Sequence, residues 1–208
     1  ESDARMITGL LARDDVRGQP FAYAPHSGYQ RMIAARTMVV LDCGENPPGV
    51  YANTAHAGFL SFEFSNGPQR IVVNCGSGNA QDIHWDSALR ATAAHSTVTI
   101  ADTSIAGLLS DGFVRDLIGP RMLDAACGVE TSRRETPQGV IVEAKHDGYV
   151  QDFGISHERT LSLSPNGGAL SGLDRLVPKG ARKAQKRIPL AVRFHIHPDV
   201  RVSPNQGG

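Results

Sequence analysis

Short stretches of alternating apolar and polar residues recur along this chain, and turn-forming residues separate them. The clearest alternation lies in residues 56–65, where Leu60, Phe62 and Phe64 would share one face of a strand. A Ser-Asn-Gly-Pro turn follows, and residues 70–75 are again strand-like. Two such runs joined by an Asn-Gly turn predict a β-hairpin.

Seven further segments have the apolar, β-branched or alternating composition of strands. They are residues 37–43, 96–101, 124–131, 139–146, 157–164, 169–177 and 190–198. Residues 103–118 fit either a short helix or a strand and loop, and His84 and Trp85 fall in a connection. Because no long helical period interrupts the strands, the sequence predicts an all-β antiparallel β-sandwich.

The composition is that of a folded domain. Hydrophobic residues form 40% of the 208 residues, which is enough to bury a core. The 21 basic residues balance the 21 acidic ones, so no net charge favours nucleic acid or an anionic membrane surface as a partner. No apolar run approaches the roughly 18 residues that a membrane helix needs. We therefore expect no nucleic-acid partner and no membrane partner.

The two ends of the chain suggest a piece of a longer protein. Residues 1–20 are polar and are expected to form a linker or short helix from a preceding domain, and residues 21–208 the sandwich. The chain begins without Met and stops in a Gly-rich turn, so we expect truncation at the C-terminus. Cys43, Cys75 and Cys127 lack CxxC spacing, which favours neither a disulfide framework nor a structural zinc knot.

Two histidines stand at the entrances of neighbouring predicted strands. His56 opens the strand at 56–65, His95 precedes the one at 96–101, and Asn74 ends the strand between them. Such histidines could converge on a metal ion or on a polar substrate group. The plainer alternative is that each ring is hydrogen-bonded to nearby backbone, and spacing alone leaves both interpretations open.

Several segments together resemble the heparinase II/III-like polysaccharide lyases, over roughly residues 25–203. The matching segments are His-Ala followed by Leu-Ser-Phe-Glu, Val-Val-Asn-Cys-Gly, Arg-x-Thr-Ala-Ala-His-Ser-Thr, Ser27-Gly28-Tyr29, His157-Glu158-Arg159-Thr160, Asp174-Arg175-Leu176 and Arg-Phe-His-Ile-His-Pro at 193–198. These lyases join an α-helical toroid to a C-terminal antiparallel β-sandwich. The resemblance implies that this chain is the sandwich, and that an N-terminal toroid domain of the same protein is its partner.

The resemblance also implies a chemistry. These lyases carry out β-elimination on an acidic, uronate-containing polysaccharide: a base removes the proton beside a neutralised carboxylate, and an acid protonates the leaving oxygen. Their sandwich contributes a His-x-His-x-Asp segment, a later Asp and a later His, and three of these residues hold a zinc ion. The resemblance therefore implies Zn²⁺ as a cofactor and an acidic polysaccharide as a partner.

The carry-over of these residues is incomplete. His56 and His95 match zinc-ligand positions, and Asn74 stands where the Asp ligand is expected. Thr54 replaces the histidine that would touch substrate, and Gly58 replaces the nearby Asp. A neutral amide is a weaker zinc ligand than a carboxylate because it does not neutralise the dication. The expected metal site thus lacks its anionic ligand, and no residue of this chain is assigned as catalytic.

Three further residues are expected to bind substrate. They are Trp85, Arg90 and His84, of which Trp85 could stack on a sugar ring. Packing at the rim is the plainer role for Trp85, and a buried ion pair for Arg90. The basic loop at 179–187 could attract an acidic glycan, but such a loop is more often simply solvated.

Three functions remain open at this point. The first is the sandwich domain of a polysaccharide lyase, inactive alone because the catalytic toroid is absent. The second is a non-catalytic carbohydrate-binding or structural sandwich with a degenerate metal site, as Thr54 and Asn74 suggest. A cupin-type metal enzyme fits less well, because the His195/His197 pair has no matching Glu. The resemblance implies a periplasmic or secreted protein.

Overall fold

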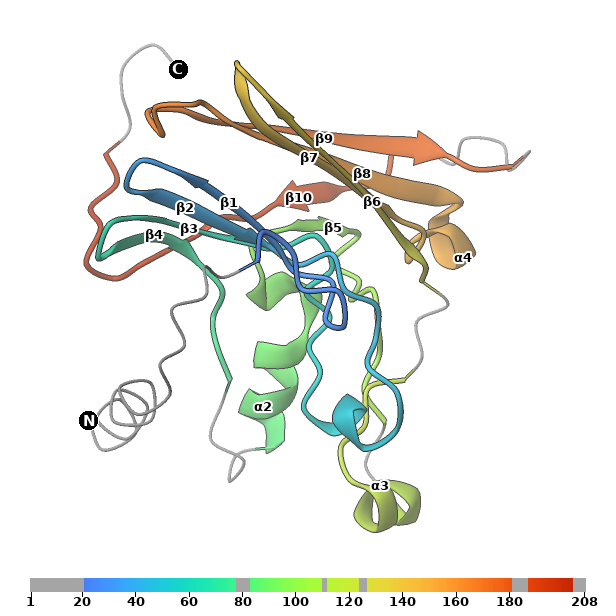
Figure 1. The fold of residues 1–208 in the computed structure, drawn as a ribbon. Helices are drawn as coiled ribbons and strands as arrows, with labels where there is room; N and C mark the ends of the chain where they lie inside the picture. The colour runs from blue at the N-terminus through green and yellow to red at the C-terminus, as the bar shows by residue number, and fades with distance from the viewer. Residues whose placement is uncertain (1–20, 78–82, 110–111, 124–126, 181–186, 204–208) are drawn as a thin grey trace.

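The strands form two antiparallel sheets that lie face to face, and a two-stranded ladder lies beside them (Figure 1). The computed structural model describes residues 21–77, 83–109, 112–123, 127–180 and 187–203. Residues 1–20, where a linker or short helix is expected, lie outside the described residues. The predicted antiparallel β-sandwich is confirmed.

The first sheet has the strand order β1-β2-β3-β4-β11. Its strands are β1 (Gln30–Ala34), β2 (Thr37–Leu41), β3 (Phe62–Asn66), β4 (Gln69–Val73) and β11 (His195–Ile196). β3 and β4 form the predicted hairpin. Gly67 in its turn has a φ of 56°, which glycine adopts without steric cost.

The second sheet is a meander in which four consecutive strands pair in order. They are β6 (Val129–Thr136), β7 (Gly139–His146), β8 (Ile155–Leu163) and β9 (Leu170–Pro178). The separate ladder pairs β5 (Val98–Ile100) with β10 (Leu190–Val192).

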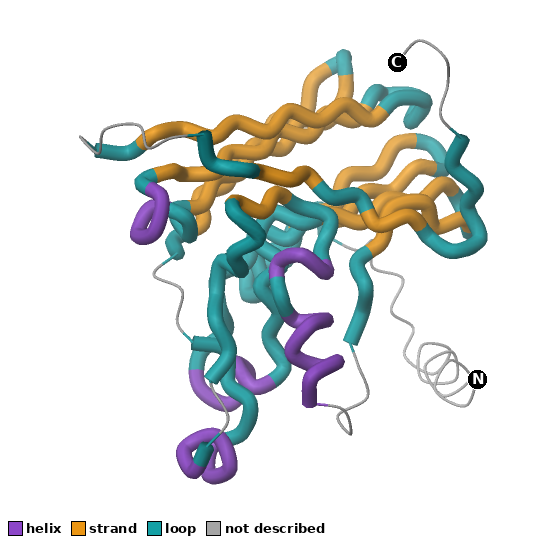
Figure 2. Tube along the Cα trace, turned by 180° about the vertical axis from the view of Figure 1, so that it is seen from behind, coloured by secondary structure: helices purple, strands orange, loops and turns teal. Residues whose placement is uncertain are grey.

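Most helical segments gather on one side, away from the second sheet (Figure 2). They are η1 (Gly49–Asn53), α2 (Ile83–Arg90), η2 (Thr92–Ala94) and α3 (Phe113–Ile118), while α4 (Val150–Phe153) lies at the end of the second sheet. No described helix is long and apolar enough to cross a membrane.

The core lies between the two sheets. The first sheet and its preceding loop contribute Met32, Val39, Leu41, Leu60 and Phe62, and the second contributes Val142, Ala144, Leu161 and Leu163. Full burial of a large aliphatic or aromatic side chain stabilises a fold by about 1.5–3 kcal/mol. Burial of this apolar layer is therefore the main contribution to the free energy that holds the two sheets together.

One buried charge crosses this layer. Arg159 on β8 is 1% exposed, and its guanidinium donates to both carboxylate oxygens of Asp174 on β9, at 2.7 and 2.9 Å. A third nitrogen donates to the carbonyls of Leu60 at 2.7 Å and Ser96 at 2.9 Å. Arg159 thus ties the second sheet to two loops of the other layer.

Two buried histidines continue this network, and their hydrogen bonds fix which ring nitrogens carry protons. The Gly148 amide donates to Nδ1 of His146, so His146 in its neutral form carries its proton on Nε2 and donates to Nδ1 of His157 at 3.1 Å. His157 then donates from Nε2 to Asp174 at 2.8 Å. Burial lowers the pKa of His146 to about 3, which keeps this ring neutral.

Most strand predictions are confirmed. β7 has the predicted bounds, and β8 and β9 lie within two residues of the predicted ones. β2 and β5 lie inside their predicted segments. Of residues 103–118, the described ones, 103–109 and 112–118, form loops and the short helix α3.

Four predictions of local structure are wrong. The strand expected from residue 56 begins only at Phe62, because residues 58–61 form a turn in which the Ser61 amide donates to the Gly58 carbonyl at 2.8 Å. His84 and Trp85 lie on α2 rather than in a connection. Of the strand predicted at 124–131, residues 124–126 lie outside the described residues, and β6 begins only at Val129. The strand predicted at 190–198 is divided between β10 and β11 in different sheets. The sequence also gave no signal for β1.

Candidate functional site

The two histidines singled out from the sequence do meet in the structure. The ring centroids of His56 and His95 lie 5.3 Å apart in an edge-to-face arrangement. His56 lies in the loop after η1, and His95 ends η2 just before β5. Neither opens a strand as predicted, yet the two segments bring the rings together.

Gly58 is what allows this close approach. A Cβ atom at position 58 would lie 2.7 Å from Cδ2 of His95 and 3.2 Å from Oγ of Ser61. An aspartate at this position, as the resemblance would have it, could not be accommodated without movement of the His95 ring. The close packing of the His95 ring against Gly58 therefore leaves no room for a carboxylate at this position.

Both imidazoles are held in the neutral form. Nδ1 of His95 donates to the Ala91 carbonyl at 2.9 Å, since a carbonyl oxygen can only accept. Burial, with smaller contributions from the neighbouring His56 and His195, lowers the pKa of His95 to about 4. Burial, and then the charge of Arg90, also lowers the pKa of His56. The pair thus carries no charge near neutral pH.

Asn74 serves the backbone rather than the histidine pair. Its Oδ1 accepts a hydrogen bond from the Ser96 amide at 2.8 Å. Its Nδ2 lies 3.5 Å from Oγ of Ser61 and 3.5 Å from a carboxylate oxygen of Glu63. The amide oxygen expected as a third ligand is therefore already committed within the fold.

These residues fit a zinc ion poorly. A structural zinc site needs four protein ligands and a catalytic one needs three. The described residues contain no group of three or more His, Cys, Asp and Glu side chains that could hold a metal. Zinc binding stays a prediction, and no chemical step is derived through it.

Arg90, expected to bind substrate, is 2% exposed and braces the loop that carries His56. Nε donates to the Ala55 carbonyl at 2.8 Å, and the two terminal nitrogens donate to the carbonyls of Pro120 at 2.6 Å and Ala52 at 3.0 Å. Asp86, one helical turn earlier, lies 3.5 Å from the guanidinium. Little of this side chain is left for a ligand.

The other two candidate substrate residues lie on the surface. Trp85 is 59% exposed on α2, and His84 beside it is also exposed. Thr54, at the position of the expected substrate histidine, is exposed at the end of η1. Their role in substrate binding stays a prediction.

A thiol–imidazole pair lies next to the histidine pair and was missed from the sequence. Sγ of Cys75 is 3.5 Å from Nδ1 of His195, and Nε2 of His195 donates to the Ala93 carbonyl at 3.0 Å. The pairing of β4 with β11 brings these residues together across 120 positions. The only local pattern at this position was the alternation of His195 with His197, and it did not indicate that Cys75 would be the partner of His195.

Comparisons with known proteins identify the family. The family model described as "Heparinase II/III-like, C-terminal" matches residues 16–208. FtsZ-localized protein C of Caulobacter vibrioides is 38% identical over an alignment of 208 positions, which covers 97% of this chain and 35% of that protein. The chain therefore spans about a third of this relative.

A solved structure confirms the fold. A mutant of the heparan sulfate lyase HepC from Pedobacter heparinus superposes with a TM-score of 0.56 over 86% of this chain and 27% of that one, at 15% identity. At this identity the similarity concerns the fold alone. Together with the family match, it shows that this chain belongs to the heparinase II/III-like family and forms its C-terminal β-sandwich domain.

Proposed function

We propose that this chain is a non-catalytic structural and binding domain of a larger heparinase II/III-like protein that localises with FtsZ. The localisation is carried over from the name of the Caulobacter relative. The acidic polysaccharide and the N-terminal domain implied by the resemblance remain the proposed partners of the whole protein.

The single observation that carries this proposal is the state of the histidine site. Thr54 presents a hydroxyl where a substrate-contacting histidine is expected, and a threonine hydroxyl is a poor general acid or base near neutral pH. The two remaining imidazoles contact each other, and His95 is bonded to backbone. These features support a packing role for the site rather than proton transfer.

Two measurements on the full-length protein test the proposal. Incubation with heparin, heparan sulfate or alginate should release no unsaturated uronate, under conditions in which an active heparan sulfate lyase does. A fluorescent fusion should co-localise with FtsZ, and deletion of residues 21–208 should change this localisation. Uronate release that depends on this domain, or a fusion that ignores FtsZ, would refute the proposal.

A second candidate function is that of a polysaccharide lyase, in which this domain forms one wall of the substrate cleft of the whole protein. The exposed Trp85 and His84 favour it, because both lie on α2, and the His56 ring donates a hydrogen bond to the Leu89 carbonyl of the same helix. An exposed indole suits stacking on a sugar ring. Here the acid and base would come from the N-terminal domain, and uronate release that is lost in Trp85→Ala would support this candidate.

A further inference from the structure

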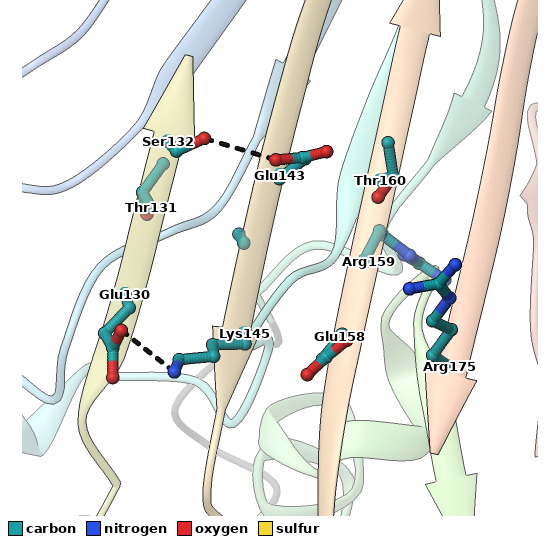
Figure 3. Close-up of a pocket in the computed structure, with 10 residues that line it drawn as sticks. Glu130, Thr131, Ser132, Glu143, Lys145, Glu158, Arg159, Thr160 and Arg175 are labelled. Atoms are coloured by element: carbon teal, nitrogen blue, oxygen red, sulfur yellow. Dashed lines mark hydrogen bonds and ion pairs between the residues drawn. The ribbon is translucent and has the colours of Figure 1, made fainter. Parts of the chain in front are cut away.

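The outer face of the second sheet carries a polar pocket that is separate from the histidine site. The pocket encloses about 340 Å³, near the lower end of the ~300–1,000 Å³ found for small-ligand sites. Figure 3 shows its lining side chains on four adjacent strands. The residues on the outward face of the strands are the carboxylates Glu130, Glu143 and Glu158, the cations Lys145 and Arg175, and the hydroxyls Ser132 and Thr160, and Thr131, Ala144 and Arg159 complete the lining.

Strand register arranges these groups in rows. Glu130, Lys145, Glu158 and Arg175 are direct neighbours across β6, β7, β8 and β9, so acidic and basic groups alternate from strand to strand. Adjacent strands lie about 4.8 Å apart, so hydrogen-bond acceptors and donors recur at this spacing.

One acid–base pair in this row is open. Lys145 and Glu130 form an ion pair at 2.9 Å, and Glu143 in the next row is paired with Arg134 at 2.7 Å. Glu158 and Arg175 face each other in register, but within the described part of the chain neither forms an ion pair or a side-chain hydrogen bond. Glu158 therefore lies between two cations, Lys145 and Arg175, and forms an ion pair with neither, so its carboxylate and the Arg175 guanidinium can both accept a ligand.

The floor of the pocket is held rigidly. Arg159, on β8 between Glu158 and Thr160, points inward, where Asp174, Leu60 and Ser96 fix its guanidinium. β8 and β9 pair without interruption from Ile155 to Leu163. The open groups thus project from a preorganised surface, which lowers the entropy cost of binding.

The charges indicate the kind of ligand. The three carboxylates of the lining are balanced by Lys145, Arg175 and Arg134 at the edge, while the third lining cation, Arg159, is paired with Asp174. The face therefore has no positive field for a sulfated or uronate-rich chain. A sugar hydroxyl, in contrast, can donate to Glu158 and accept from Arg175 at once. We propose that this pocket binds an uncharged saccharide, with Glu158 and Arg175 as its main contacts. This site goes beyond the proposed function and does not depend on it.

The test is a titration followed by NMR of the isotope-labelled full chain, with cellopentaose and penta-N-acetylchitopentaose as neutral probes and a heparin pentasaccharide as the acidic one. At least one neutral probe should shift resonances of β6–β9, and Glu158→Gln and Arg175→Ala should each weaken its affinity at least fivefold. Arg70→Ala, an exposed arginine on β4, is the matched control and should leave the affinity unchanged.

The heparin probe should not compete for the pocket. The proposal is overturned if neither neutral probe shifts these resonances, if both pocket variants bind like the wild type, or if the acidic probe displaces the neutral one. Because Arg175 is exposed and Glu158 half-buried, both variants should keep the wild-type spectrum elsewhere.

Discussion

Replacement of Arg159 by methionine should destabilise this domain more than any change at its surface. Methionine keeps much of the aliphatic volume and removes only the guanidinium. In the wild type that group is 1% exposed and holds four acceptors: two oxygens of Asp174 and the carbonyls of Leu60 and Ser96. The variant therefore tests the charge network rather than the packing of the core.

The expected loss follows from the groups left behind. Breaking a buried ion pair costs about 3–5 kcal/mol, because the remaining charge has no partner. Asp174 is 20% exposed and keeps its bond to His157, so water can relieve part of this cost. The two buried carbonyls lose this donor, at about 1–3 kcal/mol each where nothing replaces it. We expect a net loss of about 4 kcal/mol in the free energy of unfolding.

Urea denaturation followed by far-UV circular dichroism measures this loss, since the single Trp85 is too exposed to report on unfolding reliably. In a chain of this size the same loss corresponds to a fall of about 8–16 °C in Tm. Arg175→Met is the matched control on the adjacent strand and should stay within about 0.5 kcal/mol of the wild type. A loss below about 1 kcal/mol for Arg159→Met would refute the reasoning.

Three further outcomes follow from the neighbouring groups. Folding lowers the pKa of His95 from 6.5 to about 4, so the unfolded chain takes up the proton first. The share of stability that depends on His95 should be full above pH 6.5 and fall by on the order of 3 kcal/mol toward pH 4, in addition to the loss from other buried histidines such as His146, so stability should vary less with pH in His95→Asn. Elemental analysis should find less than one zinc per chain in the wild type and more in Asn74→Asp, which adds a charged ligand; one zinc per wild-type chain would contradict the fit described above. An aromatic disulfide reagent should label the exposed Cys75 in the native protein, and the buried Cys43 and Cys127 only after unfolding; equal rates for all three would contradict their placement.

What the sequence predicts well is what alternation decides locally. β7 was predicted with its observed bounds because apolar and polar residues alternate along its second half, where buried and half-buried positions alternate from Val142 to His146. The meeting of His56 and His95 was also expected, because neighbouring strands were predicted to deliver them. α2 was missed because an eight-residue helix that contains Asp86 and Ser87 shows little apolar period, and it is held in place by tertiary contacts of Arg90.

The remaining features depend on partners far away in the chain. The role of Asn74 is set by the Ser96 amide, 22 positions later, which no local pattern announces. The division of residues 190–198 arises because the Arg193 amide donates to Thr97 and the His195 amide to Ser96, so the chain leaves one ladder for another. The alternation of apolar and polar residues continues from β10 through β11, and residues 190–198 therefore look like one strand in the sequence.

Strand alternation also divides the segments that carry the family resemblance. His157, Arg159 and Asp174 point inward, where they form one hydrogen-bonded network that positions the Leu60 and Ser96 loops. Glu158 and Arg175, their neighbours in the chain, point outward into the pocket. Because successive side chains of a strand face opposite sides of the sheet, the outward residues can differ between relatives that share the inward network. The family resemblance of these segments is therefore evidence for the architecture. The ligand has to be inferred from the outward-facing residues, such as Glu158 and Arg175.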